Sequence, residues 1–512
     1  MLQIQNLTVT HSKDLAPLIA SLSFSLREGE RLALIGEEGN GKSTLLRLIA
    51  GGKYAPDYVE TQGCILCNMK TGFLPQALEE RDREKTAYEF FCEEEAFFDL
   101  TPRELGELTA RLSLPADCVY AEQRMRAFSG GERVKLQLLR LLMARPQLLL
   151  LDEPSNDLDL DTVRFLTDFL CSCGLSVLFV SHDETLLRRA ATGILLMERL
   201  RRRTVPRTAV HRMDYDTFTK TRASLFAHQE QVARKEREEF DAKMRRYDQI
   251  RSRVEHEQNV ISRGDPAGAR LLKKKMHAVT SMGRRFEREK EDMTEMPEQE
   301  EAIFAKLSCE PLPASKVVLD LSLPELAIDG RVLSRGIRLL LRGQDKLCIT
   351  GRNGAGKSTL LRHIASILRE RKDVRVFYMP QDPDDLLAPE HTPVDVLTVT
   401  GEKEENVAIC VALGSLKFTA EEMNHPCRGL SGGQKAKLMF LKMAMERPNV
   451  LLLDEPTRNL SPLSGPVVRA LFSDYPGCIL AVSHDQAFIS QVCRQERVLS
   501  ENGFLSTDFD RF

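Results

Sequence analysis

Two stretches of the chain carry glycines, a lysine and hydroxyl side chains in the order GxxxxGK[ST], which suits phosphate binding. In the first copy the residues are Gly36, Glu37, Glu38, Gly39, Asn40, Gly41, Lys42, Ser43 and Thr44. In the second they are Gly351, Arg352, Asn353, Gly354, Ala355, Gly356, Lys357, Ser358 and Thr359. Such glycines let backbone N–H groups surround phosphate oxygens, while the lysine reaches the terminal phosphates and the serine binds Mg²⁺. A Gly-rich turn without a ligand explains one such match better than two, so we expect two nucleotide-binding loops.

Two acidic pairs follow apolar runs further along the chain. Asp152 and Glu153 come directly after four leucines, and Asp454 and Glu455 come after a similar run. Carboxylates at the end of a buried strand are costly unless they act at the carboxyl edge of the sheet. The first acid of each pair is expected to hold Mg²⁺ through water, and the second to polarise an attacking water. An Asp-Glu helix cap is the alternative, but it explains two copies poorly.

The spacing of further motifs is the same in both copies. A Ser-Gly-Gly begins 24 residues before the second acid, at Ser129 and Ser431, and a Ser-His-Asp histidine lies 29 residues after it, at His182 and His484. Each glycine-rich loop follows a short apolar run and precedes a helix-like apolar period, which predicts a strand, a loop and a helix. This registration indicates one α/β fold that is present twice.

In this order the motifs resemble those of the ATP-binding cassette (ABC) ATPases. The resemblance includes a glutamine after a proline in each copy, Gln76 and Gln381, and identifies the Ser-Gly-Gly segments with the signature motif. The signature residues are Ser129, Gly130, Gly131 and Glu132 in the first copy and Ser431, Gly432, Gly433 and Gln434 in the second. The resemblance covers about four-fifths of the chain. It implies two P-loop cassettes that bind ATP and Mg²⁺ and hydrolyse ATP.

The resemblance also implies roles for the residues. Each ATP lies between the phosphate loop of one cassette and the signature helix of the other, which adds N–H groups and excludes water. Glu153 and Glu455 position the attacking water, and His182 and His484 sense the γ-phosphate. Gln76 and Gln381 count both as catalytic residues and as metal ligands. The expected Mg²⁺ ligands are Ser43, Gln76, Asp152, Ser358, Gln381 and Asp454.

Three positions depart from the family pattern. Glu38 stands where the second copy has Asn353, and because the phosphate cradle is mostly backbone, binding should survive. Ser461 replaces the aspartate that the first copy keeps at Asp159, which should weaken communication through that loop. His11 is the best candidate for an adenine-stacking ring in the first copy, and the second copy offers none, so base selectivity is expected to be loose.

The segment between the cassettes is charged and has no strand signals. Apolar residues at heptad-like spacing predict a helix from Tyr215 to Ile261, a Gly- and Pro-containing turn at 263–268, and a second helix. The seam residues are Phe240, Met244, Tyr247, Val254 and Ile261, then Leu272, Met276, Val279, Phe286 and Met293. The expected fold is therefore two cassettes joined by an antiparallel helical hairpin. We divide the chain into a first cassette (1–205), a basic linker (206–312) and a second cassette (313–512).

The charge of the chain is unevenly distributed. The 512 residues carry a net charge of −3, but residues 201–290 hold 24 Lys and Arg against 13 Asp and Glu, a net of +11. A charge run is usually a solvated helix face. Here the basic segment lies between two cassettes whose combined charge is negative, and this contrast favours a phosphate-rich partner for the segment. The residues expected to contact RNA are Arg263, Arg270, Lys273, Lys274 and Lys275.

Two cassettes joined by a long charged linker resemble the ABC-F subfamily. This resemblance implies a ribosomal partner, with the linker contacting rRNA and tRNA near the peptidyl-transferase region and ATP-driven closure controlling its insertion. It leaves open a translation factor and an antibiotic-resistance protein, and the compact turn favours the first weakly. The alternatives are an ATPase subunit that energises a separate membrane importer, and a switch in which ATP binding matters more than turnover.

Composition adds expectations about location and assembly. We see no signal peptide and no apolar run of membrane-spanning length, so a cytoplasmic protein without a transmembrane domain is expected. Twelve scattered cysteines do not form a disulfide framework, and Cys64 and Cys67 are expected to be ordinary strand residues. Since the chain carries both cassettes, they are expected to pair intramolecularly in a monomer.

Overall fold

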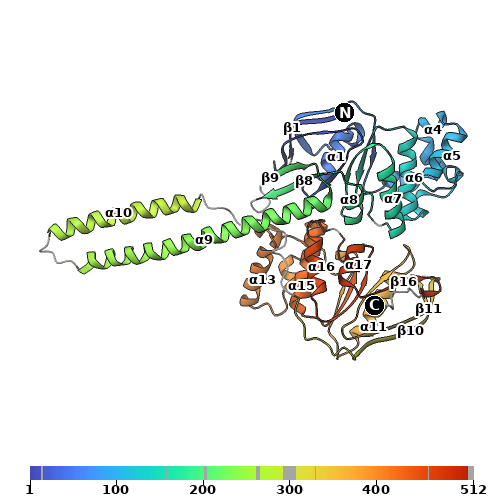
Figure 1. Cartoon of the computed structure of the whole chain (residues 1–512). Coiled ribbons are helices and arrows are strands. Elements are labelled where there is room, and N and C mark those ends of the chain that lie inside the picture. Colours follow the sequence, from blue (N-terminus) through green and yellow to red (C-terminus); the bar gives the residue numbers. More distant parts are fainter. Residues whose placement is uncertain are drawn as a thin grey trace. The chain divides into compact units, whose positions relative to one another are not determined.

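The computed structural model describes residues 1–12, 15–156, 158–200, 205–260, 266–291, 307–328, 330–458 and 460–505 (Figure 1). Contacts divide the chain into two compact units, Met1–Asp216 with Glu300–Phe512 and, separately, Thr217–Gln299. The first unit holds both mixed α/β cassettes, as the repeated motifs predicted.

Each cassette is built on a six-stranded sheet with the same strand order. In the first the order is β5-β6-β7-β3-β8-β9, with β3 (Arg31–Ile35), β5 (Thr71–Leu74), β6 (Leu148–Asp152), β7 (Ser176–Val180), β8 (Gly193–Leu200) and β9 (Val205–His211). In the second it is β13-β14-β15-β12-β16-β17, with β12 (Lys346–Thr350), β13 (Val376–Met379), β14 (Val450–Asp454), β15 (Cys478–Val482), β16 (Gln495–Ser500) and β17 (Gly503–Leu505). All strands are parallel except β9 and β17, which add antiparallel edges. The central strands are apolar throughout because helices cover both faces.

Each acidic pair ends a central strand, and a helix follows each main motif. Both phosphate loops lead into helices that begin at the motif lysine. These and the helices after the central strands are α1 (Lys42–Ala50), α7 (Leu160–Ser172), α8 (Glu184–Ala190), α11 (Lys357–Arg369), α16 (Gly465–Ser473) and α17 (Gln486–Val492).

A smaller antiparallel sheet accompanies each cassette, and here the copies differ. The first has three strands in the order β2-β1-β4, namely β1 (Leu2–His11), β2 (Pro17–Leu26) and β4 (Val59–Cys67). The second has two, β10 (Val317–Ile328) and β11 (Arg331–Arg342). Cys64 and Cys67 lie on β4, and among the described residues no group of three or more His, Cys, Asp or Glu side chains is placed to hold a metal ion.

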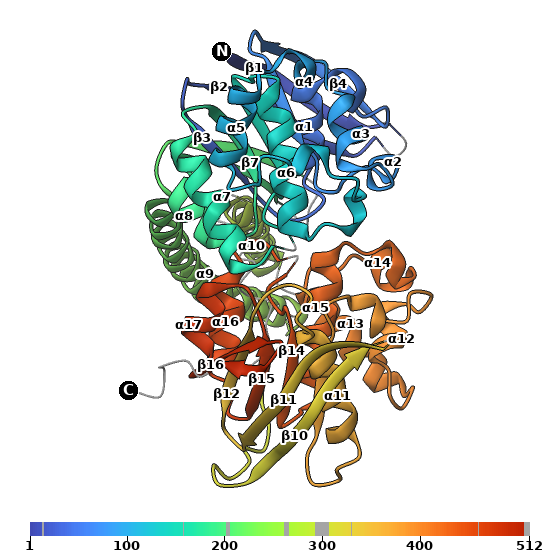
Figure 2. The same ribbon diagram turned by 90° about the vertical axis from the view of Figure 1, so that its right-hand side faces the viewer.

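A group of short helices adjoins each signature helix, and Figure 2 shows the second group gathered beside α15. The signature helices are α6 (Gly130–Met143) and α15 (Gly432–Glu446). The short helices are α2 (Glu80–Arg83), α3 (Ala87–Cys92), α4 (Ala96–Asp99), α5 (Pro102–Arg111), α12 (Pro393–Leu397), α13 (Lys403–Ser415) and α14 (Ala420–Asn424). Single 3-10 turns are η1 (Gly52–Tyr54), η2 (Cys118–Tyr120), η3 (Met125–Ala127), η5 (Pro383–Asp385) and η6 (Cys427–Gly429).

The second unit consists of two helices, α9 (Tyr215–Val260), whose first residues belong to the first unit, and α10 (Pro266–Glu291) (Figure 1). The ring of Phe286 lies 6.3 Å from that of Phe240 and 5.7 Å from that of Tyr247, measured between centroids. Lys275 Nζ lies 3.1 Å from Glu257 Oε2, nearer the far ends of the helices. Late residues of α9 thus meet early residues of α10, as in an antiparallel pair. The seam positions 261 and 293 and the expected RNA contact Arg263 lie outside the described residues.

The structure favours a shorter linker than the one expected between the cassette boundaries at 205/206 and 312/313. β9 pairs with β8, so residues 205–211 complete the first sheet, and this unit extends to Asp216. Leu307 and Leu312 are buried in the apolar cores of the second cassette. We therefore propose that the linker is shorter at both ends than residues 206–312. No helix in the described parts of the chain combines the length and apolar character needed to cross a membrane.

Candidate functional site

The two phosphate loops adopt the same backbone course. Gly41 and Gly356 precede α1 and α11 with φ of 85° and 93°, a left-handed conformation that favours glycine. Gly36 approaches β8 so closely that a Cβ would lie 2.1 Å from the carbonyl oxygen of Met197. The Asn40 side chain donates to the same carbonyl at 2.9 Å, which fixes the first loop against the sheet.

The motif lysines lie within their own loops. Lys42 Nζ donates to the carbonyl oxygens of Gly36 and Glu37, both at 2.8 Å. Lys357 Nζ donates to the carbonyl oxygens of Gly351 and Arg352 at 2.7 and 3.0 Å. Each ammonium group is thus held at the centre of a ring of backbone groups, where a nucleotide phosphate is expected.

The first acids, Asp152 and Asp454, are buried beside the loops. Ser43 Oγ donates to Asp152 Oδ1 at 2.9 Å, whereas Asp152 Oδ2 and both carboxylate oxygens of Asp454 have no hydrogen-bond partner. Burial raises the pKa of Asp152 to about 6 and also raises that of Asp454. Buried carboxylate oxygens without partners, next to a serine hydroxyl, fit a hard cation such as Mg²⁺. Ser43, Ser358, Asp152 and Asp454 are the residues that would hold it.

In the first site, Glu153 is held by two side chains. Gln76 Nε2 donates to its Oε2 at 3.1 Å, and His182 Nε2 lies 3.1 Å from its Oε1. Burial acts to raise the pKa of Glu153, but the bonds from His182 and Gln76 and the charge of Lys42 hold it below its ordinary value. An ionised carboxylate at this position suits the positioning of a water molecule.

In the second site, Glu455 is held differently. Its Oε2 accepts from the backbone N–H of His484 at 3.2 Å, while its Oε1 lies 3.8 Å from His484 Nε2 and has no hydrogen-bond partner. Burial raises the pKa of Glu455 to about 8 and lowers that of His484 to about 4. Glu153 and Glu455 share a left-handed backbone, with φ of 49° and 51°, so the difference lies in the side chains around them.

The signature motifs begin α6 and α15 with the same capping box. Ser129 Oγ accepts from the N–H of Glu132, whose carboxylate accepts from the N–H of Ser129. Ser431 and Gln434 make the equivalent pair of bonds. Each serine therefore caps the N-terminus of its own helix through the N–H of the third helical residue. The N–H groups of the two glycines are not used by this cap.

Each signature helix faces the phosphate loop of the other cassette. At the first site the N–H of Gly433 donates to Glu38 Oε2 at 2.8 Å, and Lys437 Nζ lies 3.8 Å from Glu37 Oε1. At the second site Gly130 and Arg133 line a cavity of about 890 Å³ together with residues of the second cassette. The expected site residues on its walls are Asn353, Gly354, Gly356, Lys357, Ser358, Thr359, Gln381, Asp454, Glu455 and His484, and Glu153 and His182 of the first site also reach it.

The loop after β14 contacts the first site through its backbone. His182 Nδ1 lies 2.6 Å from the carbonyl oxygen of Leu460, so the ring bridges that loop and Glu153. This contact uses the backbone of Leu460 and not the side chain of Ser461, so the weaker communication expected from Ser461 stays a prediction. At the second site the charge of Asp159 acts on His484.

Two features near the sites were not identified from sequence. Arg469 donates from its guanidinium to both carboxylate oxygens of Glu184, at 2.7 and 3.2 Å, and both side chains are buried between the cassettes. The cavity also includes Ile328, Arg331 and Leu333 of β10 and β11 near Gly356, an aliphatic and cationic surface. His11 lies beside Tyr58, with ring centroids 5.9 Å apart, rather than alone.

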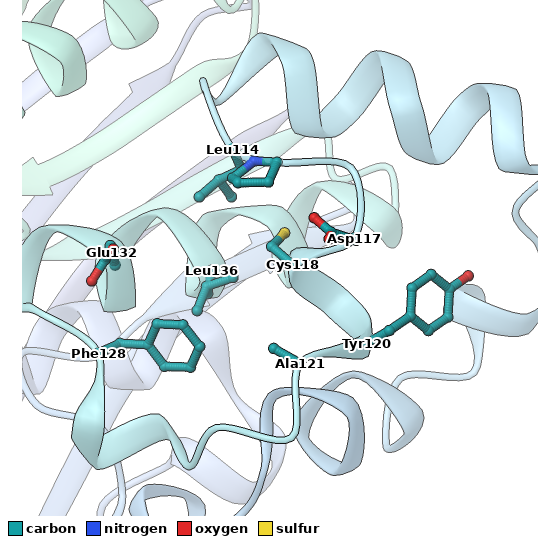
Figure 3. Close-up of a pocket in the computed structure, with 9 residues that line it drawn as sticks. Leu114, Asp117, Cys118, Tyr120, Ala121, Phe128, Glu132 and Leu136 are labelled. Atoms are coloured by element: carbon teal, nitrogen blue, oxygen red, sulfur yellow. The ribbon is translucent and has the colours of Figure 1, made fainter.

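A smaller pocket of about 340 Å³ lies behind the first signature motif (Figure 3). The side chains of Phe128, Leu136 and Cys118 turn toward it, and Tyr120 lies at its edge. Burial raises the pKa of Cys118 to about 11, so the thiol is neutral and acts as an apolar lining group. Glu132, which caps the first turn of α6, also lines this pocket.

Comparisons with known proteins agree with this architecture. The family model described as ABC transporter matches residues 19–156 and 335–458. The chain is 27% identical to human ATP-binding cassette sub-family F member 3 over 97% of its own length and 71% of that protein's. It is 24% identical to the ATP-binding protein Uup of Buchnera aphidicola, covering 100% and 82%, and 27% identical to the probable ATP-binding protein YheS of Escherichia coli, covering 92% and 74%.

Solved structures share the fold at low identity. The archaeal ribosome recycling factor aABCE1, solved in complex with the ribosomal stalk protein aP1, has a TM-score of 0.59 at 16% identity, covering 98% of this chain and 89% of that one. A chain from the model of ribosome-bound archaeal Pelota and ABCE1 has a TM-score of 0.54 at 15% identity, covering 97% and 78%. These neighbours support the arrangement of two cassettes in one chain.

Proposed function

Because the chain belongs to the ABC-F subfamily of ATP-binding cassette ATPases, we propose that it uses ATP-driven pairing of its cassettes to control binding of its basic hairpin to the ribosome. The ATPase activity follows from the family. The ribosomal partner and the closure mechanism are the proposal, and the exposed basic surface of α10 is the observation that carries it.

The basic surface of α10 consists of Arg270, Lys273, Lys274 and Lys275, all exposed. The helix contains eight Lys and Arg against three Glu. Lys275 pairs with Glu257, whereas Lys273 and Lys274 make no ion pair with a described residue. A charged surface without internal partners suits phosphate groups, and Lys273 and Lys274 are its best candidates for RNA contact.

Relatives and neighbours support the same partner class. Two of the structural neighbours are named as a ribosome recycling factor and as part of a ribosome-bound model. No Phe, Tyr or Trp lies between positions 248 and 285, so we expect this part of the hairpin to recognise RNA through backbone charge and shape.

For the ATPase step, we propose that the loop N–H groups and the motif lysines bind the phosphates, and that Glu153 and Glu455 orient the attacking water. Mg²⁺, held by the serine and aspartate of each site, would supply charge stabilisation for the phosphates. The buried Oδ2 of Asp152 and both buried carboxylate oxygens of Asp454, which have no hydrogen-bond partner, support that assignment.

Charge reversal at two lysines tests the ribosomal proposal. Lys273→Glu with Lys274→Glu should weaken co-sedimentation with ribosomes at moderate salt and lower the salt dependence by about one unit of slope per lost phosphate contact. ATPase activity without ribosomes should be unchanged.

A matched control reverses two exposed lysines of the cassettes, Lys70→Glu with Lys372→Glu, which carry the same change in charge. Equal loss of binding in the control would show that only net charge matters. Membrane association without ribosome association would overturn the proposal in favour of an importer subunit.

A further inference from the structure

We propose that Glu38 is a resident anion at the signature helix of the second cassette, which makes the first ATP site less selective for ATP over ADP than the second. The inference rests on the ATP-binding part of the proposed function and is independent of the ribosomal partner. In this inference Glu38 determines nucleotide specificity, whereas the sequence motifs identified it only as a departure from the family pattern of the phosphate loop.

The Glu38 carboxylate occupies the end of α15. The N–H of Gly433, in the first turn of this 15-residue helix, donates to Glu38 Oε2 at 2.8 Å. Ser431 Oγ accepts from the N–H of Gln434, so the Glu38 carboxylate accepts from a different N–H group, that of Gly433, which this cap does not use. Helix N-termini favour anions, because their N–H groups and dipole are positive.

A second acid reinforces this contact. Glu37 Oε1 lies 3.8 Å from Lys437 Nζ, and Lys437 is only 5% exposed. Gly433 and Lys437 are four residues apart, so both lie on the same side of the helix. The first phosphate loop thus presents two neighbouring carboxylates to one face of α15.

The second loop has the opposite character. Arg352 and Asn353 stand at the positions of Glu37 and Glu38, so the pair of side chains changes from two negative charges to one positive charge. The signature helix that this loop faces begins at Gly130 and contributes Gly130 and Arg133 to the large cavity. At these two loop positions the second site therefore has a cationic and a neutral side chain where the first site has two acids.

The consequence concerns the γ-phosphate. An anion bound between the first loop and α15 has to share or displace the N–H donor that Glu38 uses, and two like charges at hydrogen-bond distance repel each other. ADP lacks that phosphate and avoids most of the competition. At the first site, the phosphate loop therefore contacts the opposing signature helix through its own Glu38 and Glu37 side chains.

Exchange of the two residues tests the inference. Glu38→Asn installs the residue of the second loop, and Asn353→Glu is the reciprocal variant. Affinities for ADP and for a non-hydrolysable ATP analogue are measured by calorimetry on the full chain. A Lys357→Ala background isolates the first site, and a Lys42→Ala background isolates the second.

We expect Glu38→Asn to raise the affinity of the first site for the ATP analogue about tenfold, the scale of one charge-assisted hydrogen bond, with ADP affinity changed less than about twofold. Asn353→Glu should lower analogue affinity at the second site by a similar factor. Without nucleotide, the amide of Gly433 should exchange hydrogen faster in Glu38→Asn.

Glu38→Gln separates charge from hydrogen bonding, because it keeps an oxygen acceptor. It should behave like Glu38→Asn. If Gln retained the wild-type ratio of analogue to ADP affinity, or if Glu38→Asn weakened analogue binding, the inference would be wrong. If neither background bound ATP at all, the ATP-binding part of the proposed function would fail instead.

Discussion

Glu153 of the first ATP site accepts a hydrogen bond from Gln76 and lies 3.1 Å from His182 Nε2, whereas Glu455 of the second accepts one from the backbone of His484. The strand, the left-handed φ and the distance to the motif histidine along the chain are the same in both copies. The carboxyl groups nonetheless have opposite pKa shifts, because burial is offset by partners only in the first site. A repeated fold can therefore support two unlike sites.

The largest expected effect comes from removing both carboxylates. Glu153→Gln with Glu455→Gln should lower steady-state phosphate release at least about 100-fold, since positioning and deprotonating a nucleophile contributes 10² to 10⁴ in rate. If the sites differ as their geometry indicates, Glu153→Gln alone will cost more than Glu455→Gln alone. Unimpaired phosphate release by the double variant would remove both residues from this role.

The next effect concerns the buried ion pair on the wall of the second-site cavity. Arg469→Ala leaves Glu184 buried without its main partner and should lower the free energy of unfolding in urea by about 3–5 kcal/mol. Arg188→Ala removes a half-exposed partner of the same carboxylate and should cost less than about 1 kcal/mol.

A double replacement provides the control for that experiment. Glu184→Leu with Arg469→Met removes both charges and should restore most of the stability, because apolar pairs of similar volume replace buried ion pairs at little cost. A double variant as unstable as Arg469→Ala would mean that the cost comes from lost packing rather than from the unpaired charge.

His182 and His484 should contribute unequally to kcat, because their rings make different contacts. His182→Ala breaks the link from Leu460 to Glu153, whereas the ring of His484 makes no hydrogen bond to Glu455. We expect the loss of kcat to be about tenfold larger for His182→Ala, the value of one charge-assisted bond. Equal losses in single-turnover phosphate release would show that the two sites use their histidines in the same way.

The smallest effect concerns Asp159. Its carboxylate caps α7 through the N–H of Thr162 at 3.0 Å and contributes charge near Arg352 and His484. Asp159→Ser keeps a capping hydroxyl and removes the charge, so the affinity of the second site for ATP should rise by no more than about threefold. Asp159→Ala would also lose the cap, at a cost of about 1 kcal/mol of stability. A lowered ATP affinity in Asp159→Ser would contradict this view.

The local motifs were predictable because they depend on short-range chemistry. Gly41 and Lys42 lie where the first phosphate loop meets α1, and Asp152 ends β6, so the spacing of these residues along the sequence predicts the strand, loop and helix around them. The hairpin was also accessible, since the heptad pattern of α9 and α10 is local. The contacts of Glu38 and Arg469 were not, because their partners lie hundreds of residues away and depend on how the cassettes pair.

Boundaries were the weaker part of the sequence analysis. β9 carries an arginine, a proline and a histidine, so it resembled the start of a charged linker, whereas in the structure it pairs with β8. The sheet of β10 and β11 has two strands because residues 370–375 alone join α11 to β13, whereas residues 51–70, which include β4, join α1 to β5. The sequence carries this difference as a shorter interval between the motif lysine and the motif glutamine in the second copy.

The first residues of α9 are held from two sides. The Tyr215 hydroxyl donates to the carbonyl oxygen of Pro462 at 3.3 Å, and Arg188 Nε lies 3.2 Å from Asp216 Oδ1. Pro462 belongs to the loop that contacts His182 through Leu460, and Arg188 belongs to α8, which follows His182. The first turn of α9 thus contacts both cassettes, the first through Arg188 and the second through Pro462. Both contacts lie close in sequence to the first ATP site, because Pro462 is two residues from Leu460 and Arg188 is six residues from His182.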